Sequence, residues 1–290
     1  MELSIMTVSF PVDFDTAEEI YHLVTTTELE DKFSYEQVLN LYAITDDATK
    51  GFAVLAYVGE ELVGLISAID MIGIHSYEWS GLVLPDFRRR GVGKALLKAL
   101  SRNLEARGAE SELAVAVKNA PHAKVFLDAE RYEWNFSEAT LQANAIEEVA
   151  ERKVEVKPLS DEHESLTRIL MDAFEDTEGE VQTLMTFNQS DPRRHVFVAN
   201  KDGETVGTVT VVEGEDTLWV TALATSPELQ GQGIGSSILR FVLGEAGRRG
   251  VKTVMLDVEV DNDKALSLYE KVGFSPVMQV DYYVKSSATI

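Results

Sequence analysis

A glycine-rich segment near residue 230 carries the strongest chemical signal in this chain. It reads Gln230-Gly231-Gln232-Gly233-Ile234-Gly235-Ser236 and follows an extended apolar run that ends in Leu223-Ala224-Thr225. Apolar residues then recur at helical spacing, at Ile234, Ile238, Phe241 and Val242. Glycine has no Cβ atom, so backbone N–H groups can close around an anion, and a helix start adds unpaired donors. A strand, a glycine turn and a helix in this order predict a diphosphate site.

Two common phosphate-binding motifs do not fit this segment. The P-loop requires a Lys-Ser or Lys-Thr pair after its last glycine, and the chain has no such pattern here. The dinucleotide fingerprint requires a third glycine at the position of Ser236. The pattern that remains is Q-x-x-G-x-G.

A second motif lies about 30 residues further on. The run from Asn262 to Phe274 predicts a short helix that ends at Gly273. Its pattern is N-x-x-A-x-x-x-Y-x-x-x-G-F, with the tyrosine at Tyr269. The two motifs, in this order and spacing, resemble the signatures of the GCN5-related N-acetyltransferases, the GNAT family.

The resemblance implies roles for individual residues. The backbone of Leu223, Ala224 and Thr225 would pair with the pantetheine arm of acetyl-CoA. The cofactor loop would comprise Gln230, Gly231, Gln232, Gly233, Ile234, Gly235 and Ser236, and the backbone N–H groups from Gly231 to Ser236 would hold the pyrophosphate. Asn262 would contact the cofactor arm, although an N-cap is an equal alternative. Tyr269 would give a proton to the leaving thiolate as general acid, with a core tyrosine as the alternative.

Moving the second loop back by 142 positions reveals an internal repeat. Gln230 falls on Arg88, Gly233 on Gly91 and Gly235 on Gly93. The first copy therefore has its own candidate cofactor loop, with the residues Arg88, Arg89, Arg90, Gly91, Val92 and Gly93, after a strand that carries Leu82, Val83 and Leu84. The resemblance implies two tandem GNAT-like domains over residues 1–148 and 149–290. Each is expected to be an α/β fold, in which helices flank a mostly antiparallel, twisted mixed sheet.

The two copies differ at the residues expected to do chemistry. Tyr269 falls on Leu127, which has no proton to give, and Gly273 falls on Arg131, which resists a left-handed backbone. We therefore expect the first domain to be catalytically degenerate and the second to be active. The first copy could still bind a CoA-like ligand or could serve as a packing partner. Tyr132 or His122 could supply a proton in place of Leu127.

Composition limits the classes of partner. The formal net charge of −23 argues against nucleic acid as a partner and suits a cationic substrate. No apolar run is long enough to span a membrane, and the absence of cysteine excludes disulfides and thiolate metal sites. No spacing of metal ligands is found, so no metal is expected. The N-terminus lacks a basic secretory start, and a cytoplasmic location is the simplest expectation.

Periodicity along the rest of the chain predicts further elements. Helices are expected at residues 14–24 and 163–174, with strands at 51–56, 61–68, 113–117, 154–159, 195–199 and 205–212. Residues 138–153 are polar and helix-prone. The acidic segment from Glu175 to Glu180 lies between the predicted helix and strands of the second copy.

The leading functional hypothesis is an acetyl-CoA-dependent N-acetyltransferase that moves the acetyl group directly to a small or peptidyl amine in a ternary complex. One alternative is a non-catalytic acyl-CoA-binding or regulatory protein, and another is O-acyl or longer-chain transfer. The general base is open, with Glu213, Glu175 and Asp176 as candidates by loose position.

Overall fold

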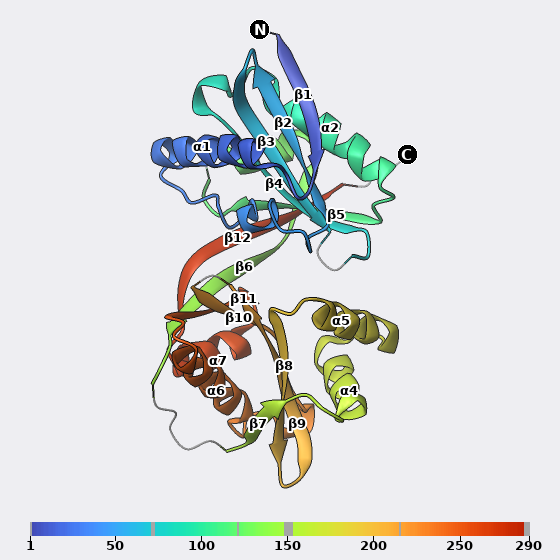
Figure 1. The fold of residues 1–290 in the computed structure, drawn as a ribbon, viewed down its shortest axis with the longest axis vertical. Helices are drawn as coiled ribbons and strands as arrows, with labels where there is room; N and C mark the ends of the chain where they lie inside the picture. Colours follow the sequence, from blue (N-terminus) through green and yellow to red (C-terminus); the bar gives the residue numbers. More distant parts are fainter. Residues whose placement is uncertain (1, 71–72, 121, 148–152, 215, 287–290) are drawn as a thin grey trace. The chain divides into compact units, whose positions relative to one another are not determined.

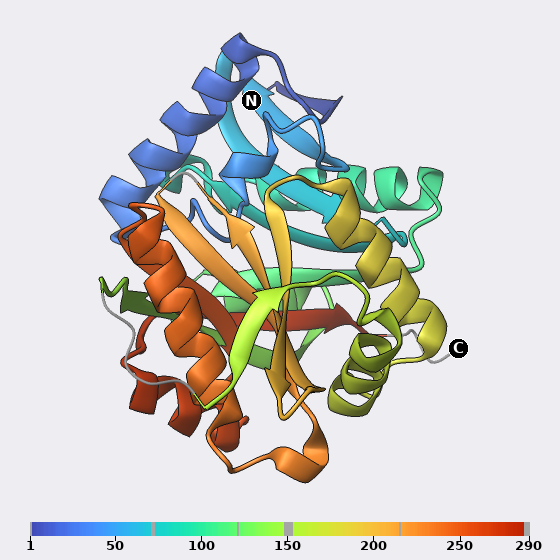
Figure 2. The ribbon, with the colours of Figure 1, turned by 60° about the horizontal axis from the view of Figure 1, so that its bottom comes forward.

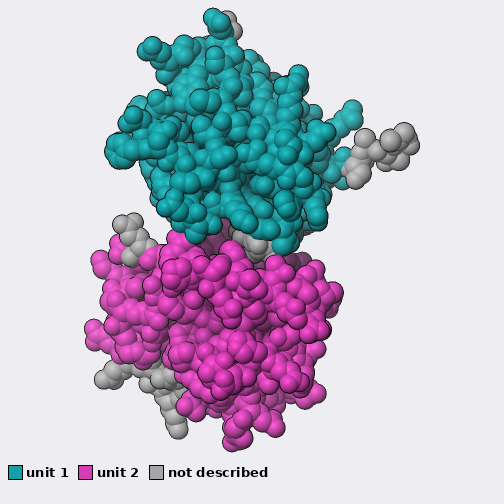
Figure 3. All heavy atoms as spheres, turned by 45° about the vertical axis from the view of Figure 1, so that its right-hand side comes forward, with its two compact units in different colours: residues 1–137, 280–290 teal, residues 138–279 magenta. Residues whose placement is uncertain are grey.

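The computed structural model describes residues 2–70, 73–120, 122–147, 153–214 and 216–286. These residues form two compact units (Figure 3). Unit 1 comprises residues 1–137 together with 280–290, and unit 2 comprises residues 138–279. The two units share one strand order, which the sequence repeat predicts.

Unit 1 is built on a sheet with the strand order β1-β2-β3-β4-β5-β12. All neighbouring pairs are antiparallel except β4 and β5, which are parallel (Figure 1). The strands are β1 (Leu3–Ser9), β2 (Gly51–Val58), β3 (Glu61–Asp70), β4 (Ser76–Val83), β5 (Ser111–Val117), the first part of β6 (Tyr132–Asn144) and the last part of β12 (Ser275–Lys285). The helices are α1 (Phe14–Asp31), α2 (Val92–Ala106) and α3 (Ala123–Ala129), with 3-10 turns at Leu41–Ala43 and Pro85–Phe87.

Both faces of this sheet are covered. Along β2, Phe52 and Val54 pack into one core with Leu96 and Leu100 of α2. The intervening Leu55 is also fully buried, and it points to the opposite face because side chains alternate along a strand. A strand buried on both faces explains why β2 reads as a nearly continuous apolar run rather than an alternating one.

Unit 2 repeats this architecture with the order β7-β8-β9-β10-β11-β6, in which β10 and β11 are the parallel pair. Its strands are β7 (Glu155–Pro158), β8 (Arg194–Lys201), β9 (Glu204–Glu213), β10 (Thr217–Thr225), β11 (Thr253–Glu259), the second part of β6 and the first part of β12. Its helices are α4 (His163–Phe174), α5 (Glu178–Ser190), α6 (Ile234–Arg248) and α7 (Asp263–Val272), with a 3-10 turn at Pro227–Leu229.

The helices of unit 2 form one layer on each side of the strands (Figures 1 and 2). Ile238 and Val242 of α6 pack with Val209 and Leu218 in the main core. On the other face, Leu166 and Leu170 of α4 and Val181 of α5 pack around Ala224 of β10. The second half of β10 is therefore held between two helical layers.

The compact units do not coincide with the two sequence copies. The last strand of the first copy, β6, runs on into unit 2, where Glu138–Asn144 pair with β11. The last strand of the second copy, β12, pairs with β5 of unit 1, with Val280 opposite Val117. The division expected at residues 148/149 follows the repeat, whereas the compact units follow this exchange of C-terminal strands.

The exchange also overturns one local expectation, because residues 138–144 are strand and not helix. Ala139, Leu141 and Ala143 are buried at alternate positions of β6. Packing of that alternating face outweighs the helix propensity of the residues between them. The expected domain boundary, and residues 148–152 of the helix-prone stretch, lie outside the described residues.

None of the helices in the described ranges combines the length and the apolar character needed to cross a bilayer.

Candidate active site

The glycine loop of unit 2 has the geometry of an anion-binding turn. Gly231 and Gly233 have φ values of 77° and 84°, in the left-handed region that favours glycine. Gly233 is the N-cap of α6, and no side chain caps the first turn. The first N–H groups of α6 are thus available to a ligand at the positive end of the helix dipole. These features fit the diphosphate of the expected cofactor.

The loop of unit 1 adopts the same backbone path with different side chains. Arg89 and Gly91 have φ values of 60° and 89°, at the positions of Gly231 and Gly233. A Cβ atom built on Gly93 would lie 3.1 Å from Phe126, and one built on Gly235 would lie 3.0 Å from Leu268. Residues 126 and 268 are also 142 apart, so each second helix packs against its loop in the same way.

An open strand edge leads to the loop in unit 2. The strands β10 and β11 pair in parallel only over Thr217–Val220, so the second half of β10 has no partner on that side within the pairing found. The Ser226 N–H donates to the Val206 carbonyl of β9 at 3.0 Å. Because antiparallel ladders alternate, the Thr225 N–H and C=O face the open edge, and those of Ala224 face β9. Of the three predicted pantetheine-binding residues, Thr225 therefore presents its backbone N–H and C=O to the open edge, and Ala224 does not.

A β-bulge interrupts β10 beside this edge, and sequence reasoning missed it. Thr221 lies opposite Thr210 and Ala224 opposite Thr208, so two residues of β10 face a single residue of β9. Ala222 has a φ of 46°, a left-handed conformation unusual for a residue with a Cβ atom. Ala222 and Leu223 therefore have no partner in the β9 register, and the bulge bends the strand beside the open edge. Alanine and leucine at this place give no compositional signal of a bulge.

The corresponding strand of unit 1 has no such bulge. Along β3 and β4 the register runs without a shift from Gly64 opposite Val83 to Asp70 opposite Tyr77. The two copies therefore differ in the backbone at the site, in addition to the side-chain differences that the sequence predicts.

Tyr269 lies on α7, the helix that packs against the start of α6. Its ring is 9% exposed and contacts the Phe274 ring edge-to-face, with 6.0 Å between the centroids. Burial raises the pKa of the Tyr269 hydroxyl, which keeps it protonated at neutral pH. Tyr269 is therefore a core tyrosine, as one sequence interpretation expects, and its role as general acid stays a prediction.

The equivalent residue of unit 1, Leu127, is buried in its core and is 4% exposed. Arg131, which takes the place of Gly273, adopts a φ of 66° after all. The helix stop is therefore preserved in both copies, at a cost of roughly 1–2 kcal/mol for the arginine. Tyr132, the alternative donor, is buried and donates its hydroxyl to Glu112 at 3.0 Å.

Asn262 acts as the N-cap of α7. Its Oδ1 accepts a hydrogen bond from the Ala265 N–H at 3.1 Å, which satisfies one of the free donors of the helix start.

The candidate bases have different environments. Glu213 is paired with His195 at 2.9 Å and with Arg249, and it lies at the end of β9 opposite Leu218, far along the strand from the loop. Asp176 is half-buried between α4 and α5, and burial followed by the nearby Glu180 raises its pKa. A raised pKa is the direction that a general base requires. Glu180 itself closes a capping box with Thr177 at the start of α5.

Arg88 of unit 1 is occupied by an ion pair. Its guanidinium contacts both carboxylate oxygens of Asp31, and its Nε donates to the Val83 carbonyl at 2.8 Å. Leu84 donates its N–H to Val63 of β3, so by alternation Val83 faces the open edge of β4. The Arg88 side chain thus occupies the Val83 carbonyl oxygen. No side-chain donor to the corresponding carbonyl of Thr225 is found among the described residues of unit 2. Gln230, at the corresponding position, is exposed.

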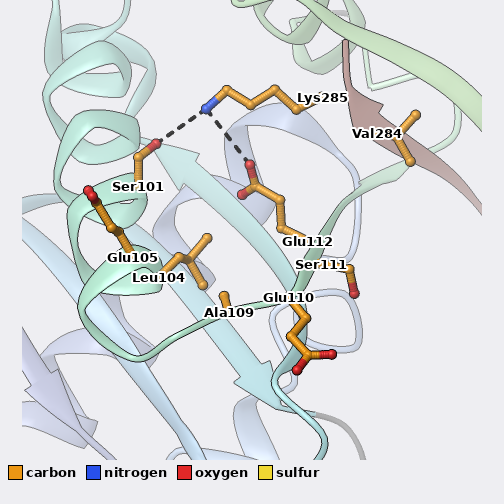
Figure 4. Close-up of a pocket in the computed structure, with 9 residues that line it drawn as sticks. All are labelled: Ser101, Leu104, Glu105, Ala109, Glu110, Ser111, Glu112, Val284 and Lys285. Atoms are coloured by element: carbon orange, nitrogen blue, oxygen red, sulfur yellow. Dashed lines mark hydrogen bonds and ion pairs between the residues drawn. The ribbon is translucent and has the colours of Figure 1, made fainter. Parts of the chain in front are cut away.

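A separate surface pocket in unit 1 lies at the other end of α2 from its glycine loop (Figure 4). Lys285 of β12 reaches Ser101 at 3.5 Å and Glu112 at 3.8 Å across it. The distance from Val92 to Leu104 along α2 is about 18 Å at 1.5 Å per residue. The contacts of Lys285 therefore hold the end of β12 to α2 and β5, and the pocket is not part of the loop site.

Comparison with known proteins identifies the class of this chain. It belongs to the acetyltransferase (GNAT) family, which it matches twice, over residues 17–128 and 163–274. Both candidate loops and Tyr269 fall within the matched ranges. The expected fold of two tandem GNAT domains is confirmed.

Among curated proteins, similarity is local. The chain is 38% identical to the [Ribosomal protein bS18]-alanine N-acetyltransferase of Escherichia coli (strain K12) over 74 residues, which is 25% of this chain and 49% of that protein. It is 38% identical to the mycothiol acetyltransferase of Streptomyces coelicolor over 80 residues, 27% of this chain and 26% of that protein. The matched region thus spans half or less of these relatives.

Solved structures resemble the whole chain in fold. A GCN5-related N-acetyltransferase from Sphaerobacter thermophilus aligns with a TM-score of 0.74 at 18% identity, covering 96% of this chain and 95% of that one. A tandem GNAT protein from the clavulanic acid biosynthesis pathway aligns with a TM-score of 0.67 at 17% identity, covering 97% and 98%.

Proposed function

We propose that this protein is an acetyl-CoA-dependent N-acetyltransferase and that its second copy, residues 149–290, carries out the transfer. The observation that carries the proposal is the open edge of β10, which has a bulge at Ala222 and leads to the glycine loop. The helix that carries Tyr269, α7, packs against this loop at Gly235. Acetyl-CoA, when bound, supplies the thioester. The Thr225 and Leu223 backbone would orient its amide arm, and the loop from Gly231 to Ser236 would bind its diphosphate.

The residues around the bulge would act on the reacting carbonyl. Backbone N–H groups at Ala222 and Leu223 are suited to stabilise negative charge on the carbonyl oxygen, as fixed donors that require no rearrangement. As the amine nitrogen bonds to the carbonyl carbon and the carbon–sulfur bond breaks, Tyr269 would give its proton to the sulfur. The amine must lose a proton in the same reaction, and Asp176 is the candidate with the favourable pKa shift.

We propose that the first copy, residues 1–148, does not carry out the transfer. Leu127 cannot donate a proton, β4 has no bulge, and Arg88 covers the Val83 carbonyl. These three features favour a copy without turnover. The substrate is proposed to be a small or peptidyl amine, because the charge of −23 attracts cations.

The direct test combines binding with turnover. Calorimetry should detect acetyl-CoA binding to the full chain, and a panel of amines should yield free thiol with at least one acceptor. Binding without thiol release from any amine would favour the non-catalytic alternative, and release with alcohols alone would favour O-acyl transfer. Absence of acetyl-CoA binding would refute the proposal.

A further inference from the structure

Two lysines from distant segments converge on the glycine loop of unit 2. The Lys153 ammonium donates to the Gln232 carbonyl oxygen at 2.9 Å. The Lys201 ammonium donates to Oε1 of the same glutamine at 3.1 Å. Gly233 is part of this arrangement, since a Cβ atom on it would lie 3.2 Å from the Lys153 ammonium. Two positive charges therefore lie against a single loop residue.

The backbone fixes the origin of both side chains. The Lys153 N–H donates to Oγ of Ser237 at 3.2 Å, and Ser237 is buried in α6. Lys201 ends β8 and is followed by a tight turn in which Asp202 and Gly203 have φ values of 53° and 86°. The loop is thus approached by one lysine from the start of the second copy and by another from the β8–β9 hairpin.

Neither lysine has a carboxylate partner within the described ranges, although the chain carries 49 acidic residues. Both ammonium groups rest on neutral oxygens, which leaves most of their charge uncompensated. Uncompensated cations beside free helix N–H groups favour a ligand with more negative charge than the helix start alone would hold.

From this geometry we infer that Lys153 and Lys201 are phosphate-binding residues that supplement the loop backbone. The inference rests on the proposed function, because the phosphates are those of acyl-CoA, either its diphosphate or its 3′-phosphate. The lysine ammonium groups would exchange their contacts with Gln232 for charged phosphate oxygens. No covalent step is involved.

The first copy meets the same requirement differently. The strand registers of the two units place Glu2 and Val58 at the two lysine positions, and neither residue is basic. The positive charges of that loop come instead from Arg89 and Arg90 within it, both of which are exposed. The lysine pair is therefore a feature of the second site and not of the repeat.

The test measures ligand affinity in the full chain with Lys153→Met, Lys201→Met and the double variant. The matched control is Lys252→Met, which removes one exposed lysine before β11, at the end of β10 away from the loop. Calorimetry gives Kd for acetyl-CoA and for 3′-dephospho-CoA at several salt concentrations. Thermal unfolding verifies that each variant is folded.

Each single variant should raise Kd for acetyl-CoA about tenfold, which corresponds to about 1.4 kcal/mol, and Lys252→Met should not. The salt dependence of binding should also weaken, which a loop merely loosened by the mutation would not produce. If 3′-dephospho-CoA is insensitive to the variants, the lysines bind the 3′-phosphate. If it is equally sensitive, they bind the diphosphate.

A double variant with unchanged Kd would overturn the inference, as would weaker binding with an unchanged salt dependence. The proposed function survives such a result as long as the wild type binds acetyl-CoA and Gly233→Val does not. A wild type that fails to bind acetyl-CoA would overturn both.

Discussion

Replacement of Tyr269 by phenylalanine isolates the proton that the proposed mechanism assigns to this residue. The ring and its edge-to-face contact with Phe274 remain, and only the hydroxyl is lost. No hydrogen bond to that hydroxyl is found within the described ranges, so the free energy of unfolding should change by less than about 0.5 kcal/mol. Loss of a general acid typically costs about 10²–10⁴-fold, or about 3–5 kcal/mol of barrier. The variant should therefore be stable but slow.

The assay is thiol release at saturating acetyl-CoA and saturating amine, with Tyr283→Phe as the control. Tyr283 is also a buried tyrosine with a raised pKa, but it belongs to unit 1. We expect kcat to fall in Tyr269→Phe alone, with the Kd of acetyl-CoA nearly unchanged. An unimpaired kcat, with the chemical step shown to limit the rate, would refute the assignment of Tyr269 as the acid.

Three further outcomes are expected. Gly247→Ala should lower the free energy of unfolding by about 1–3 kcal/mol, because its Cβ would lie 2.3 Å from the Ile146 carbonyl. Gly179→Ala has open space around it and should stabilise α5 by up to about 1 kcal/mol. Thermal melts that rank the two variants otherwise would contradict the packing. Arg88→Met should destabilise the chain near neutral pH by about 1–3 kcal/mol. The Arg88 hydrogen bond lowers the pKa of Asp31, so the pair stabilises the fold above the unfolded pKa of about 4, and this stabilisation is lost as the pH falls below that value through the lowered pKa of the folded state. The difference in free energy of unfolding between variant and wild type should therefore shrink at low pH. A pH-independent difference would argue against the ion pair. At saturating acetyl-CoA, kcat/KM for a cationic amine should decrease between 0.1 M and 1 M salt, because the Debye length falls from about 10 Å to about 3 Å. An unchanged kcat/KM over this range would show that charge steering does not contribute.

Local motifs made the repeated part of the fold predictable. Glycines at 231 and 233 require left-handed backbone, and the helices that follow have clear apolar periodicity. The comparison of Tyr269 with Leu127 also holds residue by residue, because the helices that carry them pack against equivalent glycines.

Other features depend on long-range contacts that no local pattern encodes. Whether β6 pairs with β11 or stays in its own unit depends on which sheet edge is free, and its Glu, Ala and Gln residues favour helix in isolation. The bulge at Ala222 arises from a register shift against β9, and Lys153 approaches the loop from a segment nearly 80 positions earlier. The sequence could therefore predict the glycine loop and the helix that follows it, but not the bulge beside the open strand edge or the lysines that contact the loop.

The central claim is that acetyl transfer takes place at the second loop and not at the first. The most direct measurement compares the acetyl-transfer rates of Gly91→Val and Gly233→Val, each shown to be folded. Both glycines are left-handed N-caps, with φ values of 89° and 84°, so a branched side chain imposes the same backbone strain on both loops. At Gly233 the new Cβ would also lie 3.2 Å from the Lys153 ammonium, whereas no atom lies within 4 Å at Gly91. The account predicts that Gly233→Val abolishes transfer and that Gly91→Val retains most of it. The reverse pattern, or equal losses in the two variants, would contradict it.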